Sequence, residues 1–147
     1  MSAESFTATF LVDRNPTEVF DAITDVRRWW SGTVEGTTDS LGAQFVYRHE
    51  DLHYSKQQIT KLQPGETVTW LVVDSSLNFT SDPHEWTGTE IEFEISPREG
   101  QTEVRFTHKG LVPALECYKD CSSAWSYYLN DSLRPLITKG QGLPNAT

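Results

Sequence analysis

The sequence is poor in positive charge, in cysteine and in long apolar runs. Only 12 Lys and Arg oppose 21 Asp and Glu, which gives a formal net charge of −9. A chain of this sign repels a phosphate backbone, so nucleic acid is excluded as a partner. The same charge argues against attachment to anionic membrane surfaces, because those surfaces attract basic segments.

Long apolar runs are also missing, since no window approaches the roughly 18 apolar residues that a membrane-spanning helix requires. The N-terminal segment MSAESFTATF has an acidic residue at position 4 and no basic start followed by an apolar run. This pattern excludes a secretory signal. We therefore expect a cytoplasmic protein with reduced cysteines and no membrane partner.

The two cysteines, Cys117 and Cys121, lie four residues apart in the segment ECYKDC. A zinc site needs about four ligands, and a redox pair usually has two intervening residues, so the spacing fits neither site. We interpret both cysteines as small side chains on an apolar helix face. The sequence also lacks a glycine-rich phosphate loop and a nucleophile elbow, and we expect no metal ion and no cofactor.

Aromatic residues, in contrast, are plentiful, at 12% of the 147 residues. A chain of this length is expected to form one domain with a real core, residues 1–147. Two tryptophans, Trp29 and Trp30, are adjacent in DVRRWWSG. Neighbouring side chains diverge by about 100° on a helix and about 180° on a strand, so one core cannot take both rings together.

The N-terminal part predicts a strand followed by a helix. Residues 6–12 alternate apolar and polar side chains, as a half-buried strand does. In NPTEVFDAITDV, Asn15 can cap the free amides, Pro16 suits the first helical position, and Glu18 completes a capping box. A second, very short helical turn is expected near the tryptophan pair.

The middle of the chain predicts about six further antiparallel strands. In GTEIEFEIS, strict alternation places Glu90, Glu92 and Glu94 on the outer face. Matching the faces of this strand and the next one puts Arg105 opposite Glu92 or Glu94. The six segments are TVEG, AQFVYRHE, SKQQITKL, TVTWLVV, GTEIEFEIS and TEVRFTHKG.

After Pro113, apolar residues at intervals of three and four predict one amphipathic helix of up to about 25 residues. Pro135 removes a backbone donor and crowds the preceding turn, so we expect a kink or restart at 130–134. Gly140 ends the helix. The predicted fold class is therefore α+β, with one antiparallel sheet and a long C-terminal helix.

One helix cannot cover such a sheet. A helix is about 10–12 Å across, and seven strands are far wider, so the sheet must curl or expose its aromatic inner face. Curling produces a cleft between helix and sheet. Small-molecule pockets of this kind usually enclose roughly 300–1,000 Å³. The alternative is that the protein's own side chains fill the space completely.

Five segments also carry a resemblance to a known family: NPTEVFDAITDVRRWW, PGETVTW, EWTGTEIEFEI, TEVRFTHKGLVP and CYKDCSSAWSYYLNDSLRPLITKGQG. Together they resemble the START-like (SRPBCC) helix-grip domains. The branch is the one named for homology to activators of the ninety-kilodalton heat-shock chaperone's ATPase. The resemblance runs nearly end to end, although the family pattern usually continues a helix where this sequence has Pro135.

The resemblance implies a curved sheet gripping the C-terminal helix, around a cavity that in relatives receives lipids, sterols, polyketides or other apolar small molecules. We predict that this protein binds a small apolar molecule there. We expect Trp30 to pack beneath the sheet edge and Trp29 to cover the cavity entrance beside Trp86, with the reverse assignment open. The ligand-binding candidates are Trp29, Phe45, Tyr47, Trp70, Val72, Trp86, Ile91, Phe93, Phe106, His108, Cys121, Trp125 and Tyr128.

Two other functions stay open. Strand alternation turns His49 and His108 inward, where either could transfer a proton in a cavity enzyme of the cyclase or hydrolase type. A satisfied core histidine is the simpler reading. The glutamates of EIEFE could instead dock a basic surface of a chaperone or another protein, although a solvated outer face is the simpler interpretation.

Overall fold

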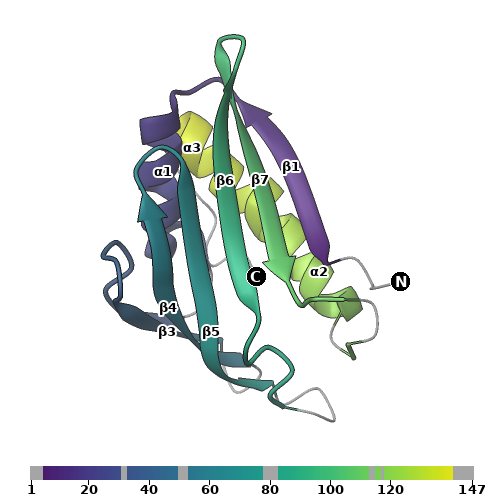
Figure 1. The fold of residues 1–147 in the computed structure, drawn as a ribbon. Coiled ribbons are helices and arrows are strands. Elements are labelled where there is room, and N and C mark those ends of the chain that lie inside the picture. The colour runs from purple at the N-terminus through teal and green to yellow at the C-terminus, as the bar shows by residue number, and fades with distance from the viewer. Residues whose placement is uncertain are drawn as a thin grey trace.

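The computed structural model describes residues 5–30, 33–49, 53–77, 83–112, 115–116 and 118–140. Within these ranges the chain forms a seven-stranded antiparallel sheet and a helical layer, as the sequence predicts (Figure 1). No helix in this part of the chain is long and apolar enough to cross a membrane. The elements are β1 (Phe6–Val12), α1 (Pro16–Thr24), η1 (Val26–Arg28), β2 (Thr33–Gly36), β3 (Gln44–His49), β4 (His53–Gln63), β5 (Thr67–Leu77), β6 (Glu90–Arg98), β7 (Gln101–Lys109), α2 (Tyr118–Tyr127), η2 (Tyr128–Leu133) and α3 (Arg134–Lys139).

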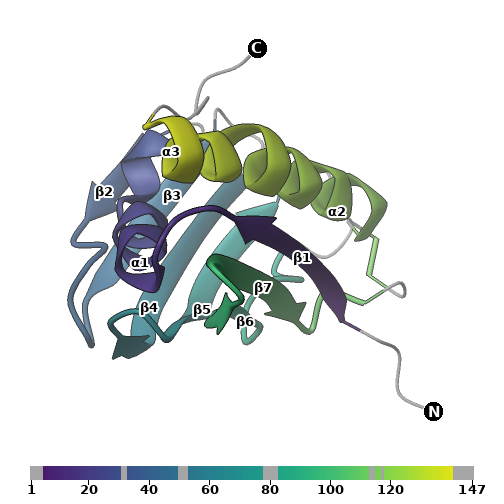
Figure 2. The ribbon, with the colours of Figure 1, turned by 90° about the horizontal axis from the view of Figure 1, so that it is seen from above.

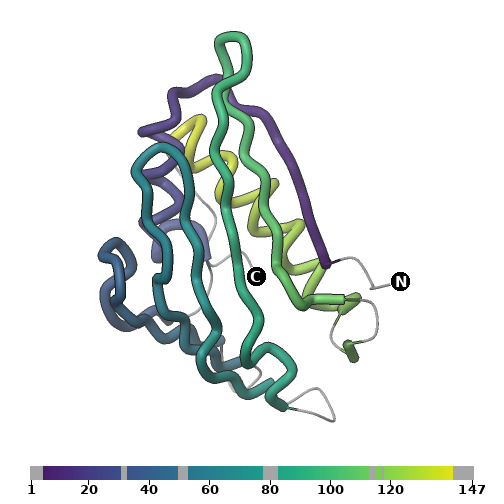
Figure 3. Tube along the Cα trace, viewed as in Figure 1, coloured from purple at the N-terminus to yellow at the C-terminus, as the bar shows by residue number. Residues whose placement is uncertain are grey.

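Strands β2 to β7 form a meander, and the first strand, β1, lies at the edge of the sheet beside the last. The strand order is β1-β7-β6-β5-β4-β3-β2. Figure 3 follows this path, with β1 beside β7 at one edge. Figure 2 shows the helical segment from α2 to α3 lying along the concave side of the sheet, with α1 near one end. The curved sheet and the C-terminal helix confirm the predicted helix-grip arrangement.

Helix α1 begins at the predicted cap. The Asn15 side-chain oxygen accepts a hydrogen bond from the Glu18 backbone N–H at 2.8 Å, and the Asn15 amide donates to the Glu18 carboxylate at 3.0 Å. Pro16 occupies the first turn, where its missing N–H leaves no intrahelical bond unmade. Val19 and Ile23 are fully buried on the face that meets the sheet.

The register of β6 and β7 is one of the two that the sequence allowed. Glu94 pairs with Arg105, and Glu92 lies 3.3 Å from the Lys109 ammonium. A hydrogen bond with the Glu92 carboxyl, followed by partial desolvation and the charge of Glu92, raises the pKa of Glu94. We call Glu90, Glu92 and Glu94 the acidic ridge. Arg105 and Lys109 therefore offset only part of the repulsion between these carboxylates.

The C-terminal helix is widened, not broken, near Pro135. Segment η2 is a π-helix, and the Arg134 backbone N–H donates to the carbonyl of Leu129, five residues earlier. Pro135 has no N–H to continue the usual ladder, so the wider turn accommodates it. The expected interruption at 130–134 is therefore a change of helical pitch, and the helix ends at Gly140, whose φ is 79°.

We expect Asn15→Ala to lower the free energy of unfolding by about 1 kcal/mol, because the Glu18 amide loses its acceptor. Urea unfolding followed by circular dichroism measures this loss. Asn15→Ser is the matched control, since serine also caps, and it should stay within a few tenths of a kcal/mol of the wild type. Equal stability of all three proteins would contradict a role for this cap.

Candidate functional site

A cavity of about 150 Å³ lies between the C-terminal helix and the β3–β4 end of the sheet. Strand and loop residues form one wall, and α2 with the start of η2 forms the other. The rim includes exposed Asp120 and Ala124 and half-buried His49. The described residues that line the cavity are Trp30, Tyr47, His49, His53, Trp86, Asp120, Cys121, Ala124, Trp125 and Tyr128.

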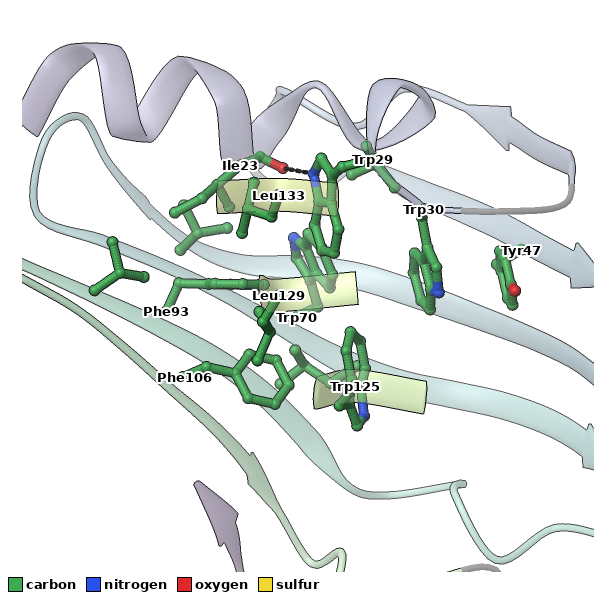
Figure 4. Close-up of a cluster of buried hydrophobic side chains, with 14 of the residues drawn as sticks. Ile23, Trp29, Trp30, Tyr47, Trp70, Phe93, Phe106, Trp125, Leu129 and Leu133 are labelled. Carbon is green, nitrogen blue, oxygen red and sulfur yellow. Dashed lines mark hydrogen bonds between the residues drawn. The ribbon is translucent and has the colours of Figure 1, made fainter. Parts of the chain in front are cut away.

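Stacked aromatic rings make up much of the cavity wall. The rings of Trp30 and Tyr47 are nearly parallel, with centroids 4.1 Å apart. The ring of Trp125 continues the wall, with its centroid 5.4 Å from that of Trp30. The ring of Trp86 lies parallel to that of Trp125, with centroids 6.0 Å apart. Figure 4 shows Trp30 between Tyr47 and the deeper tryptophans. Parallel rings of this kind provide a flat, mostly apolar surface.

The structure reverses the expected places of the two adjacent tryptophans. Trp29 is fully buried, and its indole N–H donates to the backbone carbonyl of Ile23 at 3.2 Å (Figure 4). That carbonyl lies in the last turn of α1, where the helix supplies no donor of its own. The Trp29 ring then packs near Trp70 and Phe93, and Trp30 lines the cavity. The prediction that Trp29 covers the entrance is therefore wrong. The expectation that one core cannot take both rings is also wrong, because Trp30 is only 2% exposed and its ring lies nearly parallel to that of Trp29, with centroids 6.1 Å apart.

His108 points inward as predicted, but it lies behind the cavity wall. Its side chain is 0% exposed and is not a lining residue. Trp125 donates its indole N–H to His108 Nδ1 at 3.1 Å, and Nε2 lies 2.8 Å from the Thr89 hydroxyl oxygen. The Thr89 hydroxyl donates in turn to the backbone carbonyl of Trp86 at 2.6 Å. Because Nδ1 accepts, the proton is on Nε2, and both ring nitrogens are engaged.

Burial keeps this histidine neutral. Desolvation, with a smaller contribution from the charge of His53, lowers the pKa of His108 to about 3. The chain of hydrogen bonds connects Trp125 on α2 with Trp86 in the segment before β6, so it fixes two walls of the cavity. We therefore interpret His108 as a positioning residue and not as a group that contacts a ligand.

His53 is a cavity residue that the sequence reasoning missed. Its Nε2 lies 3.1 Å from the Ser55 hydroxyl oxygen, which also accepts from the Gln57 amide at 2.5 Å. Burial, and then the charge of His49, lowers the pKa of His53 to about 3. The predicted strand began at Ser55, and the structure begins β4 two residues earlier. Extending the alternation by one more inward position would have found His53.

The thirteen predicted ligand-binding residues fall into two groups. Five of them line the cavity: Tyr47, Trp86, Cys121, Trp125 and Tyr128. The others are buried and do not line the cavity, and the ring of Phe93 joins those of Trp70 and Phe106 at centroid distances of 5.2 Å each. These core residues are Trp29, Phe45, Trp70, Val72, Ile91, Phe93, Phe106 and His108.

The cavity offers binding groups more than reactive ones. Cys121 is buried, and Cys117 lies outside the described residues. Among the described residues, no three His, Cys, Asp or Glu side chains form a group that could hold a metal ion. The lining offers aromatic contact, together with the polar side chains of Tyr47, His49, His53, Asp120 and Tyr128.

We expect the buried His108 to make folding depend on pH. In the unfolded chain its pKa is near 6.5, whereas in the folded protein it is about 3. Stability from this group is complete above pH 6.5 and falls as the pH drops towards 3, because the unfolded state binds the proton first. The wild type should therefore lose about 1 kcal/mol more than His108→Gln between pH 6 and pH 5. Urea unfolding at each pH measures the difference, and parallel profiles would contradict a neutral, buried His108.

Comparisons with known proteins agree with this architecture. Residues 13–138 match the family model described as Activator of Hsp90 ATPase homolog 1-like protein. No curated protein sequence matches the chain. The solution structure of the Aha1 dimer from Colwellia psychrerythraea has a TM-score of 0.77 and 26% identity, covering 94% of this chain and 98% of that one.

Two further structures share the fold at lower identity. The crystal structure of CalU16 from Micromonospora echinospora has a TM-score of 0.66 and 17% identity, covering 92% of this chain and 76% of that one. Protein MLL2253 from Mesorhizobium loti has a TM-score of 0.70 and 16% identity, covering 90% and 96%. With the family match extending over most of its length, the chain belongs to the Activator of Hsp90 ATPase homolog 1-like family, within the START-like (SRPBCC) superfamily.

Proposed function

We propose that this protein binds one small, mainly apolar molecule in the cavity between the sheet and the C-terminal helix. The observation that carries the proposal is the aromatic wall, in which the rings of Trp30, Tyr47, Trp86, Trp125 and Tyr128 line a single cavity. Removing apolar surface of this kind from water lowers the free energy, so a ligand that covers the wall is bound favourably. The cytoplasmic location expected from the sequence is part of the proposal.

The rigidity of the wall supports a binding role. His108 holds Trp125, and the Thr89 hydroxyl ties the same chain of hydrogen bonds to the backbone at Trp86. On the other side, Trp30 is fixed against Tyr47 by stacking. A ligand that enters a preformed site loses less free energy to ordering side chains than one that must arrange them.

A catalytic role for His108 has little support from this geometry. The ring is behind the wall, and both nitrogens already have partners. A general acid or base must come within hydrogen-bond reach of the proton that it transfers. His49, which the sequence turned inward, does line the cavity, as does His53, so a cavity enzyme would depend on one of these two histidines.

We expect Ala124→Phe to weaken binding, because Ala124 lines the cavity from an exposed position on α2 and a larger ring there would occupy part of it. Affinity for isopropylbenzene, followed by tryptophan fluorescence, should fall at least about ten-fold. Ser123→Phe is the matched control, since Ser123 is exposed on the same helix and does not line the cavity. Equal affinity of both variants would exclude this cavity as the binding site.

A second candidate function is docking of a basic partner protein, such as a chaperone, at the acidic ridge. The ridge favours docking because it keeps an excess of negative charge. Lys109 is within ion-pair distance of Glu92, yet the neighbouring Glu92 still raises the pKa of Glu94. The family description, which refers to activators of a heat-shock chaperone's ATPase, points the same way.

Reversal of Glu90, Glu92 and Glu94 to Lys should weaken capture of the ninety-kilodalton chaperone at least about ten-fold if this ridge docks it. Reversal of three exposed acids away from the ridge, Asp21, Glu35 and Asp39, gives a variant of the same net charge and serves as the control. Equal loss in both variants would assign the effect to net charge, and no loss in either would rule out docking at the ridge.

A further inference from the structure

We propose that the ligand is a compact organic cation, whose apolar body lies in the cavity and whose positive group lies beside the Asp120 carboxylate at the rim. The inference rests on the proposed function and narrows it to a chemical class. It is carried by three observations: the position of Asp120, the lack of basic side chains in the described lining, and the size of the cavity.

Asp120 is the one carboxylate among the described residues that line the cavity. It lies in the first turn of α2 and is exposed, and Ala124, one turn further along, is an exposed part of the same lining. Asp120 makes no hydrogen bond and no ion pair through its side chain within the part of the chain that the structure describes. Its negative charge is therefore available to a positive group of a ligand.

The lining lacks the side chains that usually bind anions. No Lys or Arg is among its described residues. His53 stays neutral near pH 7, because burial, and then the charge of His49, lowers its pKa to about 3. A negative group at the rim would meet the charge of Asp120 with no Lys or Arg to offset it, so the lining favours a cation over an anion.

The size limits the apolar body of the ligand to about one ring. The cavity measures about 150 Å³, below the roughly 300–1,000 Å³ of most small-molecule pockets. An apolar cavity of this size takes a molecule of the size of benzene. The rings of Trp29 and Trp70 are fully buried, with centroids 6.1 and 6.0 Å from that of Trp30, and so they fill the space behind this part of the wall.

A protonated amine or a quaternary ammonium attached to one ring or to a short branched chain meets these conditions. Its apolar body removes the aromatic wall from water. Its charge stays at the exposed rim, so the ligand avoids the large cost of moving an ion into an apolar interior. The cavity therefore binds the body, and Asp120 selects the sign of the charge.

The test compares two probes of nearly the same shape, phenyltrimethylammonium and tert-butylbenzene, which differ by one positive charge. Tryptophan fluorescence or calorimetry gives the ratio of their affinities. We expect Asp120→Asn to lower the cation-to-neutral ratio about five-fold, because only the cation loses an opposite charge. Asp120→Glu, which keeps the charge, should retain most of the ratio.

Asp131→Asn is the matched control. Asp131 is an exposed acid further along the C-terminal helix and does not line the cavity, so its removal changes the net charge equally and should leave the ratio unchanged. Benzenesulfonate, an anion of similar size, should bind the wild type at least about ten-fold more weakly than phenyltrimethylammonium.

The outcomes separate this inference from the proposed function. If tert-butylbenzene binds and the cation does not, or if Asp120→Asn affects the ratio no more than Asp131→Asn does, the inference is overturned and the cavity remains a binding site. If neither probe binds the wild type, both fail. Should Asp120→Asn not fold, the wild type decides, because a sulfonate that binds as tightly as the cation overturns the inference.

Discussion

A single C-terminal helix has to cover the concave face of a seven-stranded sheet, and the other features of this protein follow from that mismatch. Seven strands about 4.8 Å apart span roughly 30 Å, whereas a helix with its side chains is about 10–12 Å across. Curvature of the sheet removes part of the difference, and large aromatic side chains such as Trp29, Trp70 and Phe106 fill much of the remainder. The cavity lies where this filling ends, beside Trp125.

Features that depend on neighbouring residues were predictable from the sequence. The Asn15 cap and the end of the helix at Gly140 are local, and the structure has both. Alternation gave the inner and outer faces of β6 and β7 and reduced the register to two choices, but it could not select the pairing of Glu94 with Arg105. Pro135 indicated where the last helix would be irregular, although not that a wider turn would absorb the irregularity.

The site was harder to predict because its parts meet only in three dimensions. Both Trp29 and Trp30 are buried, and Trp29 reaches the carbonyl of Ile23 whereas Trp30 lines the cavity. No sequence pattern reports which indole reaches that carbonyl. Alternation correctly turned His108 inward, yet its partners come from α2 and from the segment before β6. The expected cavity was also larger, since the sequence shows which rings face inward but not how completely they pack together.

The π segment sets which side chains the last helix presents to the cavity before it and to α1 after it. A widened turn takes in one residue more than an α-helical one, and one residue corresponds to about 100° of rotation around the axis. Cys121 and Trp125 before it thus face the cavity, and Leu136 and Ile137 after it are buried near α1. Deleting a single residue from 128–133 would rotate the part of the helix after the deletion by about 100° relative to the part before it, and so turn one of these two faces towards solvent. The number of residues in 128–133 therefore fixes how the two parts of the helix are rotated relative to each other. Homologues that differ there by one residue would present a different set of side chains to the cavity.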